Sequence, residues 1–165
     1  MNKRGFTLIE LLAVIVVLGL VLVVTIPSVI GNINNNRISS LHTLSKEVAK
    51  WYDRKIVEDK LSTDKDAELE KINDNNWHCL GINNSYGLSS KNVKLDGAAT
   101  NIAVDDNAGK IINSNVDDIG NMCSAIRLVD GKAEVLLIAA EGGEFDTNSS
   151  VGTYALSSAS QGYDK

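Results

Sequence analysis

The chain has 165 residues, with 16 Lys or Arg and 21 Asp or Glu, so its net charge at pH 7 is 16 − 21 = −5. This length allows one modest domain plus an anchor and excludes a large multidomain protein. Phosphate binding needs clustered Lys and Arg, and no basic stripe is present, which disfavours nucleic-acid binding by the isolated chain.

The most apolar stretch lies between Gly5 and Ile30, and residues 11–24 within it carry no polar side chain. About 20 helical residues cover roughly 30 Å, the hydrocarbon thickness of a bilayer. Lys3 and Arg4 precede the stretch and are expected to stay on the cytoplasmic side of the membrane, which leaves everything after Ile30 on the outer side. A secretory signal peptide fits less well. Signal peptides have a shorter apolar core followed by a small-x-small cleavage site, whereas the apolar run of this chain is longer and no such site follows it.

Glu10 is the one carboxylate in this apolar stretch. An ionisable group inside a membrane segment is costly and usually marks a function with a partner nearby. The nearest cations in the chain, Lys3 and Arg4, lie on the far side of Gly5. An ordinary N-terminal anchor therefore explains every feature of the stretch except Glu10.

The residues KRGFTLIELL, with Pro27 further on, closely resemble the N-terminal signature of type IV pilins. The resemblance combines a short basic leader, a Gly-Phe junction, Glu four residues beyond that Phe, and an apolar helix of suitable length. It extends from Lys3 to about Ile30, roughly one sixth of the chain.

The resemblance implies that a prepilin peptidase cuts between Gly5 and Phe6 and then methylates the new amine of Phe6. Residues 1–5 are then a leader, and the mature chain has 165 − 5 = 160 residues and a side-chain charge of 14 − 21 = −7. Glu10 is expected to meet the Phe6 amine of a neighbouring subunit, a charge-assisted contact that offsets much of the cost of burying both groups.

The implied partners are identical pilin subunits in a helical homopolymer, the prepilin peptidase, an inner-membrane platform protein and an assembly ATPase; no cofactor is implied. The chain would be a single-pass membrane protein before assembly and part of an extracellular pilus afterwards.

Apolar residues recur every three or four positions from Ile30 to Ile56, as on one face of a helix. The pattern predicts that the membrane helix, residues 6–30, continues into an amphipathic half, residues 31–60. Pro27 removes a backbone donor and predicts a kink or local melting, and Gly19 weakens the apolar half. Two interpretations of Pro27 remain open: it is simply a proline that a membrane helix tolerates, or it allows the helix to bend during assembly. The resemblance favours the bend.

Residues 61–165 are expected to form an exposed globular domain. Ser62 or Thr63 could cap a short helix over residues 64–72. From Trp77 onward, short alternating runs predict strands. The clearest is a hairpin from Ser124 to Ala139 turning at Asp130-Gly131; weaker candidates are residues 92–95, 100–104, 110–112 and 152–156. The predicted class is α+β, a long N-terminal helix packed against a small antiparallel sheet, as in the pilin fold.

Cys79 and Cys123 are the two cysteines, and both would lie outside the membrane. A disulfide between them would enclose 123 − 79 + 1 = 45 residues, and two buried thiols are the alternative. The disulfide is favoured because the space outside the cytoplasmic membrane is oxidising enough for disulfides to persist. A metal site with His78 lacks the usual ligand spacing, and His42 is remote in sequence.

Residues 142–145 spell GGEF and resemble the signature loop of diguanylate cyclases. Only 20 residues follow Phe145, and the N-terminal half is occupied by the long helix, so a polar loop explains these residues better. Calcium occurs in pseudopilins, which share this N-terminus, and acidic residues are available as ligands: Asp105, Asp106, Asp117, Asp118, Glu141, Glu144 and Asp146. No EF-hand spacing is present, and solvated turns are the simpler interpretation.

These observations predict a structural protein rather than an enzyme. The expected function is that of a type IV pilus subunit, polymerised into a filament for adhesion, surface motility or biofilm formation. The alternatives are a minor pilin, a pseudopilin of a type II-like secretion system, or a simple membrane-anchored binding domain if the leader is never cut.

Overall fold

The computed structural model describes residues 6–63, 77–81, 86–95, 104–105, 110–111, 123–149, 152–159 and 162–164. Within them lie one helix, α1 (Leu8–Leu61), and seven strands: β1 (His78–Cys79), β2 (Val104–Asp105), β3 (Lys110–Ile111), β4 (Ala125–Val129), β5 (Lys132–Ile138), β6 (Thr153–Leu156) and β7 (Tyr163–Asp164). The chain divides into two compact units, Met1–Asn35 and Asn36–Lys165, which we describe separately.

The first unit is the apolar part of α1. Its large hydrophobic side chains, from Phe6 to Ile33, are all exposed. Within the described residues, α1 is the one helix long and apolar enough to cross a membrane, and its most apolar 18-residue window has no buried residue. These side chains therefore need an apolar environment that the chain itself does not supply.

α1 is 54 residues long and its helical assignment continues through Pro27. The predicted continuation of the apolar helix into an amphipathic half is confirmed, and the helix ends at Leu61, where Ser62 donates its N–H to Glu58 and Asp59 carbonyls. The local melting expected at Pro27 is absent. Proline removes one backbone donor, and the helix remains continuous on both sides of it.

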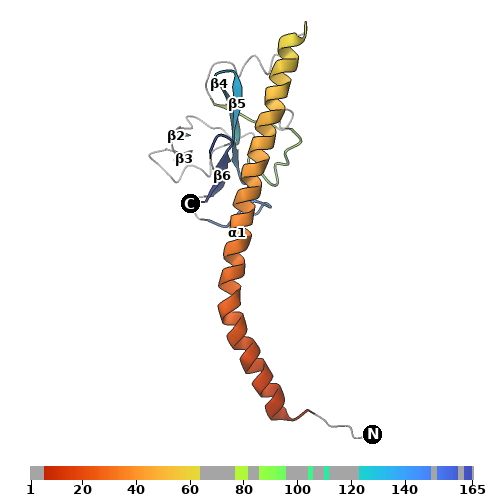
Figure 1. Ribbon diagram of the computed structural model, residues 1–165, viewed down its shortest axis with the longest axis vertical. Coiled ribbons are helices and arrows are strands. Elements are labelled where there is room, and N and C mark those ends of the chain that lie inside the picture. The colour runs from red at the N-terminus through yellow and green to blue at the C-terminus, as the bar shows by residue number, and fades with distance from the viewer. Residues whose placement is uncertain are drawn as a thin grey trace, which may run out of the picture. The chain divides into compact units, whose positions relative to one another are not determined.

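The second unit holds a five-stranded antiparallel sheet in the order β1-β4-β5-β6-β7. The hairpin of β4 and β5 confirms the clearest prediction, and it pairs Ala125 with Leu136 and Val129 with Lys132. Its turn residues have positive φ, 51° at Asp130 and 76° at Gly131, as a two-residue type I′ turn requires. Figure 1 shows β4, β5 and β6 beside the outer part of α1.

The weaker strand predictions have mixed outcomes. Residues 153–156 form β6, as predicted. Residues 92–95 make only an isolated bridge, Val93 with Ala139, which two backbone hydrogen bonds close: Lys94 donates its N–H to the Ile138 carbonyl, and Ala140 donates its N–H to the Asn92 carbonyl. β2 and β3 overlap the ends of two further candidates, whose remaining residues lie outside the described part, as does the expected helix over residues 64–72.

Both faces of the sheet are buried. Alternate residues of β5, such as Val135 and Leu137, face a cluster that includes Leu41, Val48 and other buried residues of α1. The intervening residues face a second cluster on the opposite side: Cys123, Ala125, Leu136, Ile138, Tyr154 and Leu156. Two-sided burial explains why β5 is a continuous apolar run rather than an alternating one. The α+β class, a long helix packed against a small antiparallel sheet as in the pilin fold, is confirmed.

Candidate functional site

The start of α1 is organised by Thr7 and Glu10. The Glu10 carboxylate oxygen Oε2 accepts hydrogen bonds from the Thr7 backbone N–H and from the Thr7 hydroxyl, both at 2.8 Å. In return, Thr7 Oγ1 accepts a longer bond, 3.4 Å, from the Glu10 N–H. This reciprocal arrangement is a capping box, in which an N-terminal Thr and a Glu three residues later satisfy helix-end donors.

The capping box gives Glu10 a local role that the sequence prediction did not include. The signal was present in the residues Thr7-Leu8-Ile9-Glu10, which match the pattern of Ser or Thr followed three residues later by Glu. Both bonds are accepted by Oε2, so Oε1 has no donor among the described residues. One carboxylate oxygen thus fixes the helix start while the other is left to a further partner.

The other N-terminal site residues are exposed. Phe6 is 84% exposed and directly precedes Thr7, whereas Gly5 lies outside the described residues. Apart from the helix's own nearby backbone and the two chain neighbours, no atom lies within 4 Å of where a Cβ of Gly19 would stand, so nothing packs on the helix there. Thr25 donates its hydroxyl to the Val21 carbonyl at 3.1 Å, which satisfies a polar group inside the apolar run.

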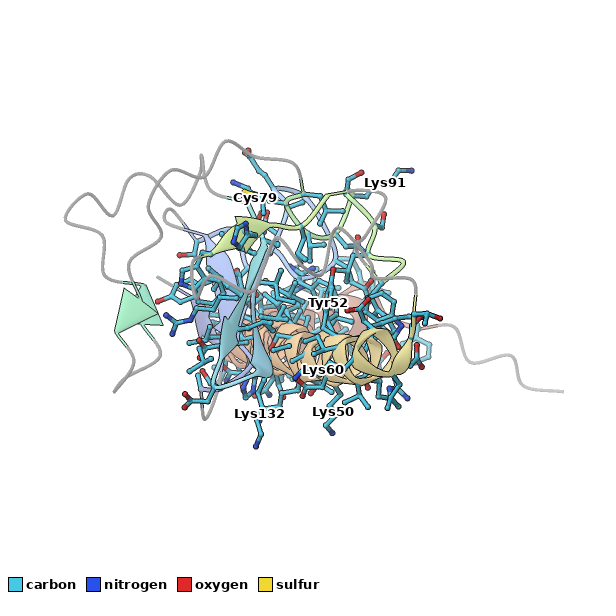
Figure 2. All side chains as sticks on the ribbon, turned by 90° about the horizontal axis from the view of Figure 1, so that it is seen from above. Lys50, Tyr52, Lys60, Cys79, Lys91 and Lys132 are labelled. Carbon is cyan, nitrogen blue, oxygen red and sulfur yellow. A yellow bond between two sulfur atoms is a disulfide. The ribbon has the colours of Figure 1, made fainter. Side chains whose placement is uncertain are left out.

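In the second unit, Cys79 and Cys123 form a disulfide with a Cα–Cα distance of 5.7 Å. The bond joins the end of β1 to a residue just before β4, beside the pairing of His78 with Ile126. Cys79 is exposed and labelled in Figure 2, whereas Cys123 is fully buried. Because both sulfurs are in the disulfide, neither is a free thiolate that could bind a metal with His78.

The C-terminal residues are held on α1 near the start of the second unit. His42 Nε2 donates to the Ala159 carbonyl at 3.0 Å. Gly162 lies against the helix so closely that a Cβ would stand 2.7 Å from the Ile38 carbonyl oxygen. Burial lowers the pKa of His42 below its ordinary value, the bond to Ala159 partly offsets this, and the charge of Lys46 lowers the pKa further.

The GGEF residues form a tight loop after β5. Gly142 has a φ of 70°, and a Cβ at Gly143 would stand 2.5 Å from the Lys91 carbonyl oxygen. Asn92 donates its side-chain amide to Glu144 at 3.1 Å. The two glycines are thus required by turn geometry and close backbone approach, as expected for a structural loop.

Asp146 ends this loop with its carboxylate already satisfied. It accepts bonds from the Gly142 N–H at 2.7 Å and the Asn148 N–H at 2.9 Å, and Arg37 of α1 donates to the Asp146 backbone carbonyl. Among the described residues, no group of three or more His, Cys, Asp or Glu is placed to hold a metal ion. The side chains of Asp105, Asp106, Asp117 and Asp118 lie outside what the structure describes.

Residues 1–26 match the family model of the prokaryotic N-terminal methylation motif, which is the signature of type IV pilins and their precursors. The resemblance inferred from KRGFTLIELL is therefore confirmed for this segment. No curated protein and no solved structure matches the chain. The motif supports a pilin-like or pseudopilin precursor. Proteins with this motif form a structural class and not an enzyme class. The motif and the apolar helix also fit anchoring in the membrane before assembly.

Proposed function

We propose that the chain is the precursor of a type IV pilus subunit. The prepilin peptidase cleaves it between Gly5 and Phe6 and methylates the amine of Phe6. The mature subunit then leaves the membrane with the help of a platform protein and an assembly ATPase, and it polymerises through the apolar half of α1 with identical copies into an extracellular filament.

The observation that carries the proposal is the methylation motif at the start of α1, followed by an apolar half whose large hydrophobic side chains are all exposed. A membrane covers such a surface first, and a bundle of identical helices can cover it afterwards, because each neighbour supplies the apolar contacts that lipid supplied before. The carboxylate of Glu10 fits this sequence of environments, since its bonds to Thr7 satisfy one oxygen in the precursor. Cleavage adds the cationic Phe6 amine that a neighbour's Glu10 can bind.

N-terminal sequencing of protein sheared from cells tests the cleavage and the modification together. We expect methyl-Phe6 as the first residue of a filament fraction. Recovery of an unprocessed chain beginning at Met1, found in membranes alone, would contradict the proposal and favour a simple membrane-anchored binding domain. Abundance in the sheared fraction separates a major subunit from a minor pilin or a pseudopilin, which the shared motif does not.

Substitution at Glu10 tests the assembly role. We expect Glu10→Val to insert in the membrane as the unmodified chain does but to yield few filaments. Because Glu10 also belongs to the capping box, Thr7→Val is the matched control: it removes the hydroxyl of the box and keeps the carboxylate. If Thr7→Val loses filaments as severely as Glu10→Val, helix capping rather than pairing with Phe6 explains the effect.

A further inference from the structure

Residues 146–150 read Asp-Thr-Asn-Ser-Ser and contain the acceptor pattern for N-linked glycosylation. In that pattern an Asn is followed two positions later by Ser or Thr, with any residue except Pro between them. Asn148 and Ser150 satisfy it. Asp146 stands two positions before Asn148, where bacterial transferases of this kind select an acidic residue, since a cation of the enzyme can pair with the carboxylate.

A second Asn-x-Ser pattern occurs in the chain, at residues 83–85. It has Gly81 in place of the acidic residue, and its own residues lie outside the described part of the structure. The segment around Asn148 is therefore the one that combines the full pattern with a described acceptor side chain.

The structure places Asn148 at the surface. Asn148 is exposed, whereas the two residues before it, Asp146 and Thr147, are only 8% and 7% exposed. The Asn148 backbone N–H donates to the Asp146 carboxylate at 2.9 Å, but the Asn148 side-chain amide makes no hydrogen bond within the described residues. A glycan on this amide nitrogen would thus displace no contact of the described fold.

The backbone around Asn148 forms a fixed turn. Its φ of 56° is a value that Asn adopts more readily than most residues other than Gly. Thr147 is held on one side, because its N–H donates to Thr153 Oγ1 at 3.2 Å and the two hydroxyls are 2.8 Å apart. The turn therefore presents the Asn148 side chain at a defined place on the second unit.

We propose that Asn148 is N-glycosylated on the outer side of the membrane by an oligosaccharyltransferase whose donor is a lipid-pyrophosphate-linked oligosaccharide. The Asn148 side-chain nitrogen bonds to the anomeric carbon of the first sugar, and the bond from that carbon to the pyrophosphate oxygen breaks. The electron pair of the broken bond leaves with the lipid pyrophosphate, and the amide nitrogen gives one proton to a base of the enzyme. The inference rests on the proposed function in one respect, the export of the second unit.

The buried carboxylate of Asp146 sets the order of events. In the folded loop it accepts hydrogen bonds from the Gly142 and Asn148 N–H groups, and Arg37 of α1 holds the Asp146 backbone carbonyl. A transferase that pairs with this carboxylate reaches it only when these bonds are open. Glycosylation therefore precedes the closing of the loop on α1, and the folded turn then carries the glycan outward.

Peptide mapping of the full chain isolated from its own cells tests the modification. Trypsin cuts after Lys and Arg, so residues 133–165 form one peptide that contains Asn148, and residues 72–91 form another that contains Asn83. We expect the first peptide to carry the added mass of several sugar residues, located on Asn148 by fragmentation. The same peptide without added mass would overturn the proposal and leave Asn148 as a turn residue alone.

Three variants identify the acceptor and the recognition pattern. Asn148→Gly removes the acceptor nitrogen and suits the positive φ, and Ser150→Ala removes the hydroxyl of the pattern. Both should lose the added mass, whereas the matched control Ser150→Thr keeps the hydroxyl and should retain it. The urea unfolding transition of each variant checks that it is folded. If Asn148→Gly keeps the sugar mass, the glycan is on a hydroxyl oxygen and the proposal is wrong.

Reconstitution tests the order of events. The full chain in detergent is incubated with a purified bacterial oligosaccharyltransferase and its lipid-linked oligosaccharide, either folded or after reduction and alkylation in urea. Transfer to the unfolded chain should be at least about tenfold faster, because the folded chain reacts only through its rare open state. Equal rates would overturn the order inferred from Asp146.

The failures of the two proposals are distinguishable. Filaments that begin with methyl-Phe6 and contain an unmodified peptide 133–165 overturn the glycosylation and leave the pilus assignment intact. A glycan on Asn148 of a chain that still begins at Met1 and is found in membranes alone overturns the pilus assignment and supports the glycosylation.

Discussion

Removing the disulfide between Cys79 and Cys123 should destabilise the second unit strongly. The bond closes a loop of 45 residues, since the two cysteines are 44 positions apart. In the chain-entropy model, closing a loop of this length lowers the conformational entropy of the unfolded chain, which stabilises the folded state by about 4 kcal/mol at 25 °C. For a chain of this size that corresponds to a fall in Tm of roughly 8–16 °C. The variant should be Cys79→Ser with Cys123→Ala, because Cys123 is fully buried and a hydroxyl there would need a partner.

The assay is urea unfolding of the full chain in detergent, followed by tryptophan fluorescence. Trp51 and Trp77 are the two tryptophans, and both belong to the unit Asn36–Lys165, so the signal reports that unit and not the apolar helix. Prior reduction of the unmodified chain should give the same loss without any substitution, and reductant should leave the double variant unchanged. If the free energy of unfolding falls by less than about 1 kcal/mol in both the double variant and the reduced unmodified chain, the reasoning is wrong. Such a result would mean that the loop is already restricted in the unfolded chain without the disulfide.

Three further predictions concern single contacts in the same unit, each read by the same unfolding assay. Gly143→Ala should lower the free energy of unfolding by about 1–3 kcal/mol, because its Cβ would press on the Lys91 carbonyl. Asp53→Ala should cost about 1–3 kcal/mol by leaving the Ala133 N–H without its acceptor, while Asp53→Asn, which keeps an acceptor oxygen, should cost less. The pKa of His42 is lowered by folding, so the unfolded chain takes up the proton first: the contribution of His42 to stability should be complete above its ordinary pKa of 6.5 and should decrease as the pH falls below that value. His42→Gln should remove this part of the pH dependence, and an unchanged slope would contradict the assignment.

Local patterns in the sequence were enough to predict the helix and the hairpin. The apolar run and the recurrence of hydrophobic residues up to Ile56 are properties of consecutive residues, and they fix where α1 is apolar and where it is amphipathic. Asp130-Gly131 predicted the turn because few residue pairs adopt positive φ at both positions at low cost. The capping box of Thr7 and Glu10 was equally local and could have been found from its spacing alone.

Short strands could not be predicted in this way. β1 and β7 have two residues each, which is too few for an alternating pattern, and they exist because a longer strand lies next to them. Residues 92–95 alternate as a strand would, yet their position relative to β5 allows a single bridge. Pairing of this kind is decided by partners distant in sequence.

By itself the sequence determined that the chain has a membrane-type helix, a methylation motif at residues 1–26 and an outer domain with a hairpin at its centre. The tertiary structure decided what depends on separated residues meeting: the disulfide instead of two buried thiols, the burial of both sheet faces, and the close packing of Gly162 on α1. It also decided that Lys46, Lys50 and Arg54 are exposed, since they lie opposite the helix face that packs on the sheet. Periodicity places residues on one face of a helix, but the packing of the whole domain decides which face is left for a partner.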